Sequence, residues 1–264
     1  MMKCIVLFLI IILNYKYAIG RNVGETEITT DDGIEVFQEE KYYLLKKNVN
    51  IVSDEFEISG DLVKIYFEKD LYDIQELIAS TGVIFKSNEY NIEGKGETLK
   101  FNIQNEKINV SGEKSELFLE TTEMFSDGSI TVNNLAGSFS IEGSNSKIIS
   151  DTIFITGFTI NGILVNENGI REISKLEVYD ENILSIITED TEMFSKKAFY
   201  DREKSIIELF DSVKIKRGGE IITGDYGILD TNNNSYKVSS NNSNKVKVII
   251  SNTKWANFNY LIMD

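Results

Sequence analysis

Short stretches of alternating apolar and polar residues, separated by Gly, Asn, Asp and Ser, fill the chain from Arg21 onward. Such alternation puts apolar side chains on one face of a β-strand and polar side chains on the other. The clearest example is 213–217, which is followed by Gly218-Gly219 and by a second alternating stretch at 220–223. Two glycines between alternating stretches predict a β-hairpin with a two-residue turn.

Turn-forming residues recur about every 8–12 residues, as they do in sheets of many short antiparallel strands. They lie at 32–33, 59–60, 94–96, 111–112, 127–128, 167–169 and 232–234. The chain of 264 residues contains no proline, so strands can continue without losing backbone donors. A helical period is hard to find, and we interpret 71–79 as a turn followed by a strand. The pattern predicts an all-β sandwich, barrel or roll.

An internal repeat sharpens this prediction. Segments 49–60, 83–94 and 213–224 share the pattern Val-x-Ile or Val-x-Phe, six residues, then Ile-x-Gly. An apolar residue follows five positions after each Gly. The repeated residues should face the same side of a sheet, and one hairpin cannot bury that face alone. We therefore expect the hairpins to stack on one another.

The N-terminus has the features of a secretory signal peptide. Lys3 precedes an unbroken apolar run over 4–13, and Ala18-Ile19-Gly20 forms a small-x-small cleavage site. We expect export and cleavage after Gly20, which would leave 21–264. A retained membrane anchor is the alternative, although such a short run would rise only about half of the hydrocarbon thickness as a helix.

Composition narrows the function classes. Histidine is absent and the only cysteine, Cys4, lies in the predicted leader, so the commonest general base and a thiol nucleophile are missing. We expect no enzymatic activity, no catalytic residues, no cofactor and no metal. The leader holds two lysines and no acidic residue, so its removal takes the formal charge from −15 to −17. This charge argues against nucleic acid as a partner.

The repeat unit resembles that of the LptA/OstA family of periplasmic lipopolysaccharide-transport proteins, which is related to LptC. The clearest copy is 211–225, and the copy at 47–61 is nearly as good. The middle copy has Lys95 where the other two have Asp. The resemblance covers 34–111 and 170–250. Segment 113–168 fits loosely, and we interpret it as extra strands within one OstA-like domain at 21–264.

The resemblance implies an elongated, open β-jellyroll or β-roll with an apolar interior, located in the periplasm. Proteins of this family stack end to end between an inner-membrane LptC-like protein and an outer-membrane LptD-like assembly. Acyl chains of lipid A slide through their shared groove without covalent chemistry. The implied partners are therefore lipopolysaccharide, LptC-like and LptD-like proteins, and a second copy of the chain in a head-to-tail oligomer.

On this interpretation the inward residues of the repeats line a lipid-binding groove. They are Val49, Ile51, Ile58, Ile65, Val83, Phe85, Ile92, Leu99, Val213, Ile215, Ile222 and Leu229. For each residue taken singly, a closed core is the alternative to contact with a ligand.

The expected function is a lipopolysaccharide carrier that bridges the inner and outer membranes during export. Two alternatives stay open: an LptC-like transfer partner tethered to the inner membrane by an uncleaved N-terminus, and a surface β-roll that serves as an adhesin or scaffold. The aromatic tail with Trp255, Phe258 and Tyr260 is interpreted either as a last strand or as a docking segment.

Overall fold

The computed structural model describes residues 21–69, 73–150, 153–241 and 244–251. The predicted signal peptide at 1–20 and the three aromatic residues of the C-terminal tail lie outside the described residues.

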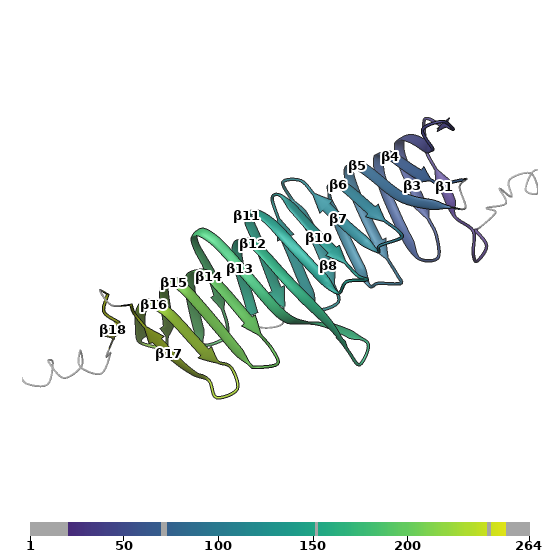
Figure 1. The fold of residues 1–264 in the computed structure, drawn as a ribbon. Helices are drawn as coiled ribbons and strands as arrows, with labels where there is room; N and C mark the ends of the chain where they lie inside the picture. Colours follow the sequence, from purple (N-terminus) through teal and green to yellow (C-terminus); the bar gives the residue numbers. More distant parts are fainter. Residues whose placement is uncertain (1–20, 70–72, 151–152, 242–243, 252–264) are drawn as a thin grey trace, which may run out of the picture.

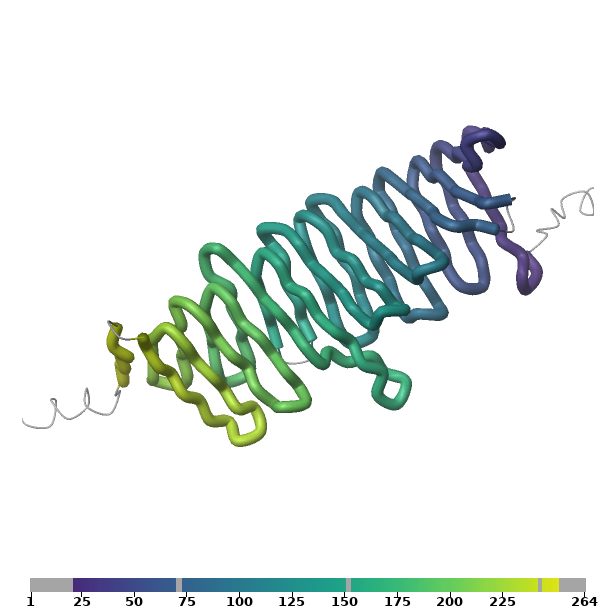
Figure 2. Tube along the Cα trace, viewed as in Figure 1, coloured from purple at the N-terminus to yellow at the C-terminus, as the bar shows by residue number. Residues whose placement is uncertain are grey.

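The described residues form one elongated antiparallel sheet of 18 strands that is coiled into a flattened roll (Figures 1 and 2). The strands are β1 (Glu27–Thr29), β2 (Ile34–Phe37), β3 (Tyr42–Val52), β4 (Phe56–Phe67), β5 (Ile74–Ser87), β6 (Ile92–Asn102), β7 (Lys107–Ser111), β8 (Ser115–Leu119), β9 (Thr122–Ser126), β10 (Ser129–Asn133), β11 (Ser138–Ser150), β12 (Ile153–Glu167), β13 (Ile170–Ile187), β14 (Thr191–Asp201), β15 (Ile206–Arg217), β16 (Glu220–Asp230), β17 (Ser235–Ser239) and β18 (Lys247–Ile250). The predicted all-β, hairpin-built roll is confirmed.

The roll has two layers, and the long strands pass from one layer to the other. Strand β6 pairs with β7 through 98–102 and with β8 through 92–95. Strand β16 likewise pairs with β17 through 226–230 and with β18 through 220–223. We call the layer that contains β7, β10 and β17 the first layer, and the layer that contains β8, β9 and β18 the second layer.

Each long strand bends at a corner between the layers. The pairing register shifts between Lys46 and Val49 in β3, and again between Phe210 and Val213 in β15. The residues that precede each Val have positive φ, 48° at Asn48 and 58° at Ser212, which turns the chain sharply. The repeated Val is therefore the first residue after a corner.

Two of the three repeat copies share the same register. Val49 pairs with Gly60 and Val213 pairs with Gly224. The middle copy differs, because Val83 pairs with Gly96 and not with the predicted Gly94. The middle hairpin has two more residues between its paired Val and Gly than the other two hairpins. Gly94 therefore has the same spacing from its Val in sequence as Gly60 and Gly224, but it does not occupy the same position in the sheet.

The corner glycines allow neighbouring strands to approach closely. A Cβ atom on Gly96 would lie 2.6 Å from Val110 Cγ1, and one on Gly224 would lie 2.5 Å from Val238 Cγ1. The prediction of turns at 59–60 and 94–96 is therefore wrong, since both segments lie inside strands at corners. The predicted two-residue turn at Gly218-Gly219 is confirmed, with Arg217 paired to Glu220.

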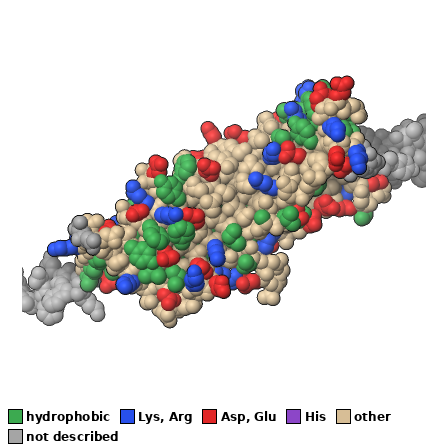
Figure 3. All heavy atoms as spheres, in the orientation of Figure 1, with side chains coloured by type: hydrophobic (Ala, Val, Ile, Leu, Met, Phe, Trp, Pro, Cys, Tyr) green, Lys and Arg blue, Asp and Glu red, His purple; other side chains and the backbone are tan. Residues whose placement is uncertain are grey.

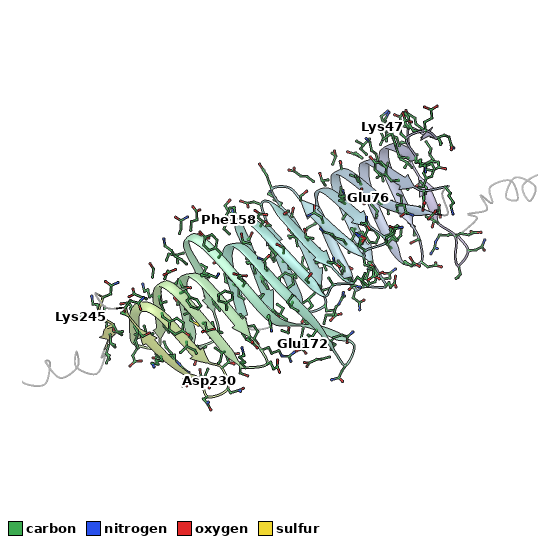
Figure 4. The ribbon with its side chains drawn as sticks, in the orientation of Figure 1. Lys47, Glu76, Phe158, Glu172, Asp230 and Lys245 are labelled. Atoms are coloured by element: carbon green, nitrogen blue, oxygen red, sulfur yellow. The ribbon has the colours of Figure 1, made fainter. Side chains whose placement is uncertain are left out.

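Corners and turns occupy opposite long sides of the roll. In Figure 4, Lys47 and Phe158 lie along one side, whereas Glu172 and Asp230 lie along the other. On this second side the turns of the first layer, such as 103–106 and 134–137, face those of the second layer, such as 88–91 and 120–121. We call this line, where no strand of the described residues crosses between the layers, the seam.

Candidate functional site

The twelve residues predicted to line a groove all belong to the face of the sheet that points between the two layers. Eleven of them are no more than 4% exposed, and Ile222 is half-buried. In the N-terminal half this interior is filled with side chains, for example by the Phe85 and Phe101 rings, whose centroids are 5.4 Å apart. Such burial agrees with a closed core in this half, and lipid contact by the twelve residues stays a prediction.

An apolar cavity of about 470 Å³ lies between the layers farther along the roll. Its apolar wall comes from both layers and includes Ile148, Ile155, Leu176, Val178, Ile186, Ala198 and Ile207. Among the described residues that line it, none belongs to the twelve predicted positions. The volume lies in the range of about 300–1,000 Å³ that is typical of small-molecule sites.

One inward position of β14 beside the cavity carries a small side chain. Ala198 pairs with Val178 on one side and with Leu209 on the other, and all three side chains are buried. Ala contributes only a methyl group where its neighbours contribute larger side chains. Ile186 lines the cavity from the opposite layer.

The rim of the cavity is polar. Thr121 and Ser150 border it from the second layer, and Glu172, Tyr200 and Arg202 border it from the first. Arg202 Nη2 lies 2.5 Å from Glu172 Oε2, and burial raises the pKa of the Tyr200 phenol. The site thus combines an apolar interior with a mouth that carries charge, an arrangement that suits an amphiphile.

The hairpin of β12 and β13 projects from the roll (Figures 1 and 2). Ile170, Glu172 and Ile173 of this hairpin line the cavity. Near its tip, Arg171 Nε lies 3.2 Å from Glu120 Oε1, and the Arg171 backbone N–H donates to Glu120 Oε2 at 2.5 Å. Arg171 Nη1 donates to Asn134 Oδ1 at 2.5 Å, and Nη2 donates to the Tyr90 carbonyl. We call Arg171, Glu120, Asn134 and the Tyr90 carbonyl the clasp.

The clasp is well shielded from solvent. The side chains of Arg171 and Glu120 are each 13% exposed. Burial, followed by the nearby carboxylates of Glu106 and Glu89, raises the pKa of the Tyr90 phenol to about 12. Sequence reasoning missed the clasp, because Glu120 and Arg171 are 51 positions apart and neither belongs to a motif.

A second hollow, of about 890 Å³, lies on the outer face of the first layer. Its floor includes short polar side chains on adjacent strands, and Ser140 Oγ donates to Asn161 Oδ1 at 2.7 Å. Phe199 and Ile228 border it toward the C-terminus. The face in Figure 3 shows hydrophobic side chains gathered over the C-terminal part of the roll and few hydrophobic or charged side chains in the middle.

Both ends of the roll expose apolar strands. At the C-terminal end, β18 pairs with β16 and carries Val248, Ile249 and Ile250, which are 49%, 44% and 66% exposed. At the N-terminal end, β2 pairs with β3 and carries Ile34 and Val36, which are 50% and 47% exposed. Exposed apolar strands at a sheet edge are ready to pair with another strand.

Two further features of the described residues bear on function. No helix among them is long and apolar enough to cross a membrane. Their acidic side chains form no group of three or more that could hold a metal ion.

Comparisons with known proteins find similarity to solved structures. No family model and no curated protein matches the chain. Among solved structures, the chain is similar to the crystal structure of LptH, the LptA-homologous periplasmic component of the lipopolysaccharide transport device of Pseudomonas aeruginosa. The two are 7% identical, the match covers 86% of this chain and 96% of LptH, and the TM-score is 0.22. At such a TM-score, the fold assigned to this chain rests on its own strand pairing.

Proposed function

We propose that this chain is a periplasmic carrier that shelters acyl chains of lipopolysaccharide between its two layers. The observation that carries the proposal is the apolar cavity of about 470 Å³ with a polar mouth. Exposing a CH₂ group to water costs about 0.8 kcal/mol relative to burying it, so exposing an acyl chain of roughly a dozen methylenes costs on the order of 10 kcal/mol. An apolar interior lowers that barrier without a chemical step.

The exposed strands at the two ends support assembly into a bridge. Strand β18 at one end and β2 at the other each present apolar residues to solvent. If the end with β17 and β18 of one copy meets the end with β1 and β2 of the next, β17 can continue into β2 and β18 into β1, which extends both layers from protein to protein. In this proposal the same edges meet a second copy of the chain within a bridge and LptC-like and LptD-like proteins at its termini.

Titration with purified lipopolysaccharide tests the carrier function. A fluorescent fatty acid should bind saturably to the protein, and lipopolysaccharide should displace it, because both place acyl chains in the cavity. The matched control is the saccharide part of the same lipopolysaccharide after removal of its acyl chains, which should not displace the probe. Absence of probe binding, or equal displacement by the deacylated saccharide, would contradict the proposal.

A surface scaffold or adhesin is the second candidate, and the outer hollow, which is lined by residues between Lys107 and Ile228, favours it. Short hydroxyl and amide side chains such as Ser140 and Asn161 offer hydrogen bonds to an uncharged polar partner. Binding of the deacylated saccharide, unaffected by competing fatty acid, would favour this candidate over the carrier.

A further inference from the structure

The hairpin of β12 and β13 forms one border of the cavity mouth. Ile170, Glu172 and Ile173 of the hairpin line the cavity, as do Thr121 and Thr122 of the opposite layer. The clasp residues Arg171 and Glu120 are immediate chain neighbours of these lining residues. The clasp therefore joins the two layers at the cavity mouth, where no strand crosses between them.

We propose that this hairpin is a strap that closes the cavity from the side, and that opening the clasp admits the acyl chain through the seam. The inference rests on the proposed function for the identity of the ligand, whereas the gating of access to the cavity stands on the geometry of the hairpin alone.

Arg171 is suited to hold a closed state because one guanidinium joins three separate turns. Its partners lie in the turn between β5 and β6 (Tyr90), the turn between β8 and β9 (Glu120) and the turn between β10 and β11 (Asn134). The planar fork of Arg can satisfy several acceptors at once. With the two charged side chains at 13% exposure, losing one contact leaves charge poorly solvated, so the contacts should break together.

The strap has a place to bend. The register of β12 and β13 shifts between Ile163 and Leu164, and beyond it the pairing runs from Leu164 with Ile173 to Glu167 with Ile170. The end of the hairpin can therefore swing as a unit while its own ladder stays paired. Most side chains of this end are exposed or half-buried, which is typical of segments that open locally.

The strap is also fixed at its base. The Leu164 N–H donates to the Gly137 carbonyl at 2.8 Å. Arg202, in the turn after β14, contacts Glu172 at 2.5 Å and Glu167 at 3.2 Å. The ion pairs of Arg202 tie the end of the hairpin to its own layer, so the end must release them or carry the Arg202 side chain with it when the clasp opens. Of the hydrogen bonds and ion pairs named here for the strap, those of Arg171 to Glu120 and to the Tyr90 carbonyl join it to the second layer.

Thiol labelling tests the strap without a ligand. The full chain with Cys4→Ser has no thiol, so Ala198→Cys places a single one in the cavity wall and Ala79→Cys places one in the closed N-terminal interior. Ala198 and Ala79 are 1% and 0% exposed, which makes them a matched pair. Arg171→Ala should speed labelling at position 198 by about tenfold or more. A tenfold change corresponds to about 1.4 kcal/mol. Labelling at position 79 should not change.

Two results would overturn the strap: an unchanged labelling rate at position 198, or equal acceleration at both positions, which would report general loosening of the roll. A second measurement follows the fluorescent fatty acid. Arg171→Ala should raise its association and dissociation rates together while changing Kd much less. If the protein with Arg171 in place binds no fatty acid, the proposed carrier function is wrong. The labelling rates still decide whether the hairpin gates the cavity.

Discussion

Ala198→Phe should abolish high-affinity binding of acyl chains while leaving the roll folded. Ala198 lines the cavity with a single methyl group and lies between Val178 and Leu209 on the neighbouring strands. A phenyl ring at this position would occupy space that the ligand needs. We expect Kd for the fluorescent fatty acid to rise at least about tenfold, a loss of about 1.4 kcal/mol or more.

Ala79→Phe is the matched control for this substitution. Ala79 is 0% exposed in the filled half of the interior, where an added ring has no cavity to enter. Overpacking there should destabilise the fold by about 1–3 kcal/mol or more, whereas Ala198→Phe should cost less because a cavity receives the ring. Thermal unfolding and probe titration of both variants check this. Equal loss of stability in the two variants would mean that no cavity receives the ring at position 198. Full binding of the probe by Ala198→Phe would mean that the cavity does not hold the ligand.

A charge on an end strand should stop end-to-end association of the protein. Ile250→Lys places a lysine on β18, whose residue Ile250 is 66% exposed, and Val36→Lys does the same on β2 at the other end. Lysine on an edge strand opposes strand pairing between molecules. We expect the unsubstituted protein to form concentration-dependent oligomers in sedimentation velocity and each variant alone to remain monomeric.

Mixing the two variants distinguishes head-to-tail pairing from other modes of association. Val36→Lys leaves the β18 end intact and Ile250→Lys leaves the β2 end intact, so a mixture should form dimers that cannot grow further. Longer oligomers in the mixture, or unaltered oligomers of either variant alone, would show that these two edges are not the joint.

Alternation and turn chemistry predicted most of the fold. The two-residue turn at Gly218-Gly219 and the inward face of the repeats followed directly from residue order. The corners did not, because a glycine inside a strand and a glycine in a turn look alike in sequence. Gly60 and Gly96 lie within strands, and Gly96 lets the adjacent strand approach closely at a bend.

The candidate site was harder to predict than the fold. The repeats drew attention to 49–99 and 213–229, whereas the cavity is lined by residues between Thr121 and Ile207. A cavity depends on the volume left between two layers, which a pattern of apolar residues does not encode. A small inward residue is not a sufficient signal, because Ala198 lies between Val178 and Leu209 beside the cavity, whereas Ala79 lies between Val63 and Leu99 in the filled half.

The most direct test of the carrier is photocrosslinking to purified lipopolysaccharide from defined positions. A photoreactive amino acid would replace Ile186 in the cavity, Phe85 in the filled N-terminal interior, or Lys214 on the outer face. We predict lipid adducts at position 186 and none at position 214, with position 85 reporting whether the sheltered path extends into the N-terminal half. A folded protein that forms no adduct at position 186, or forms equal adducts at 186 and 214, would contradict a lipid-binding interior.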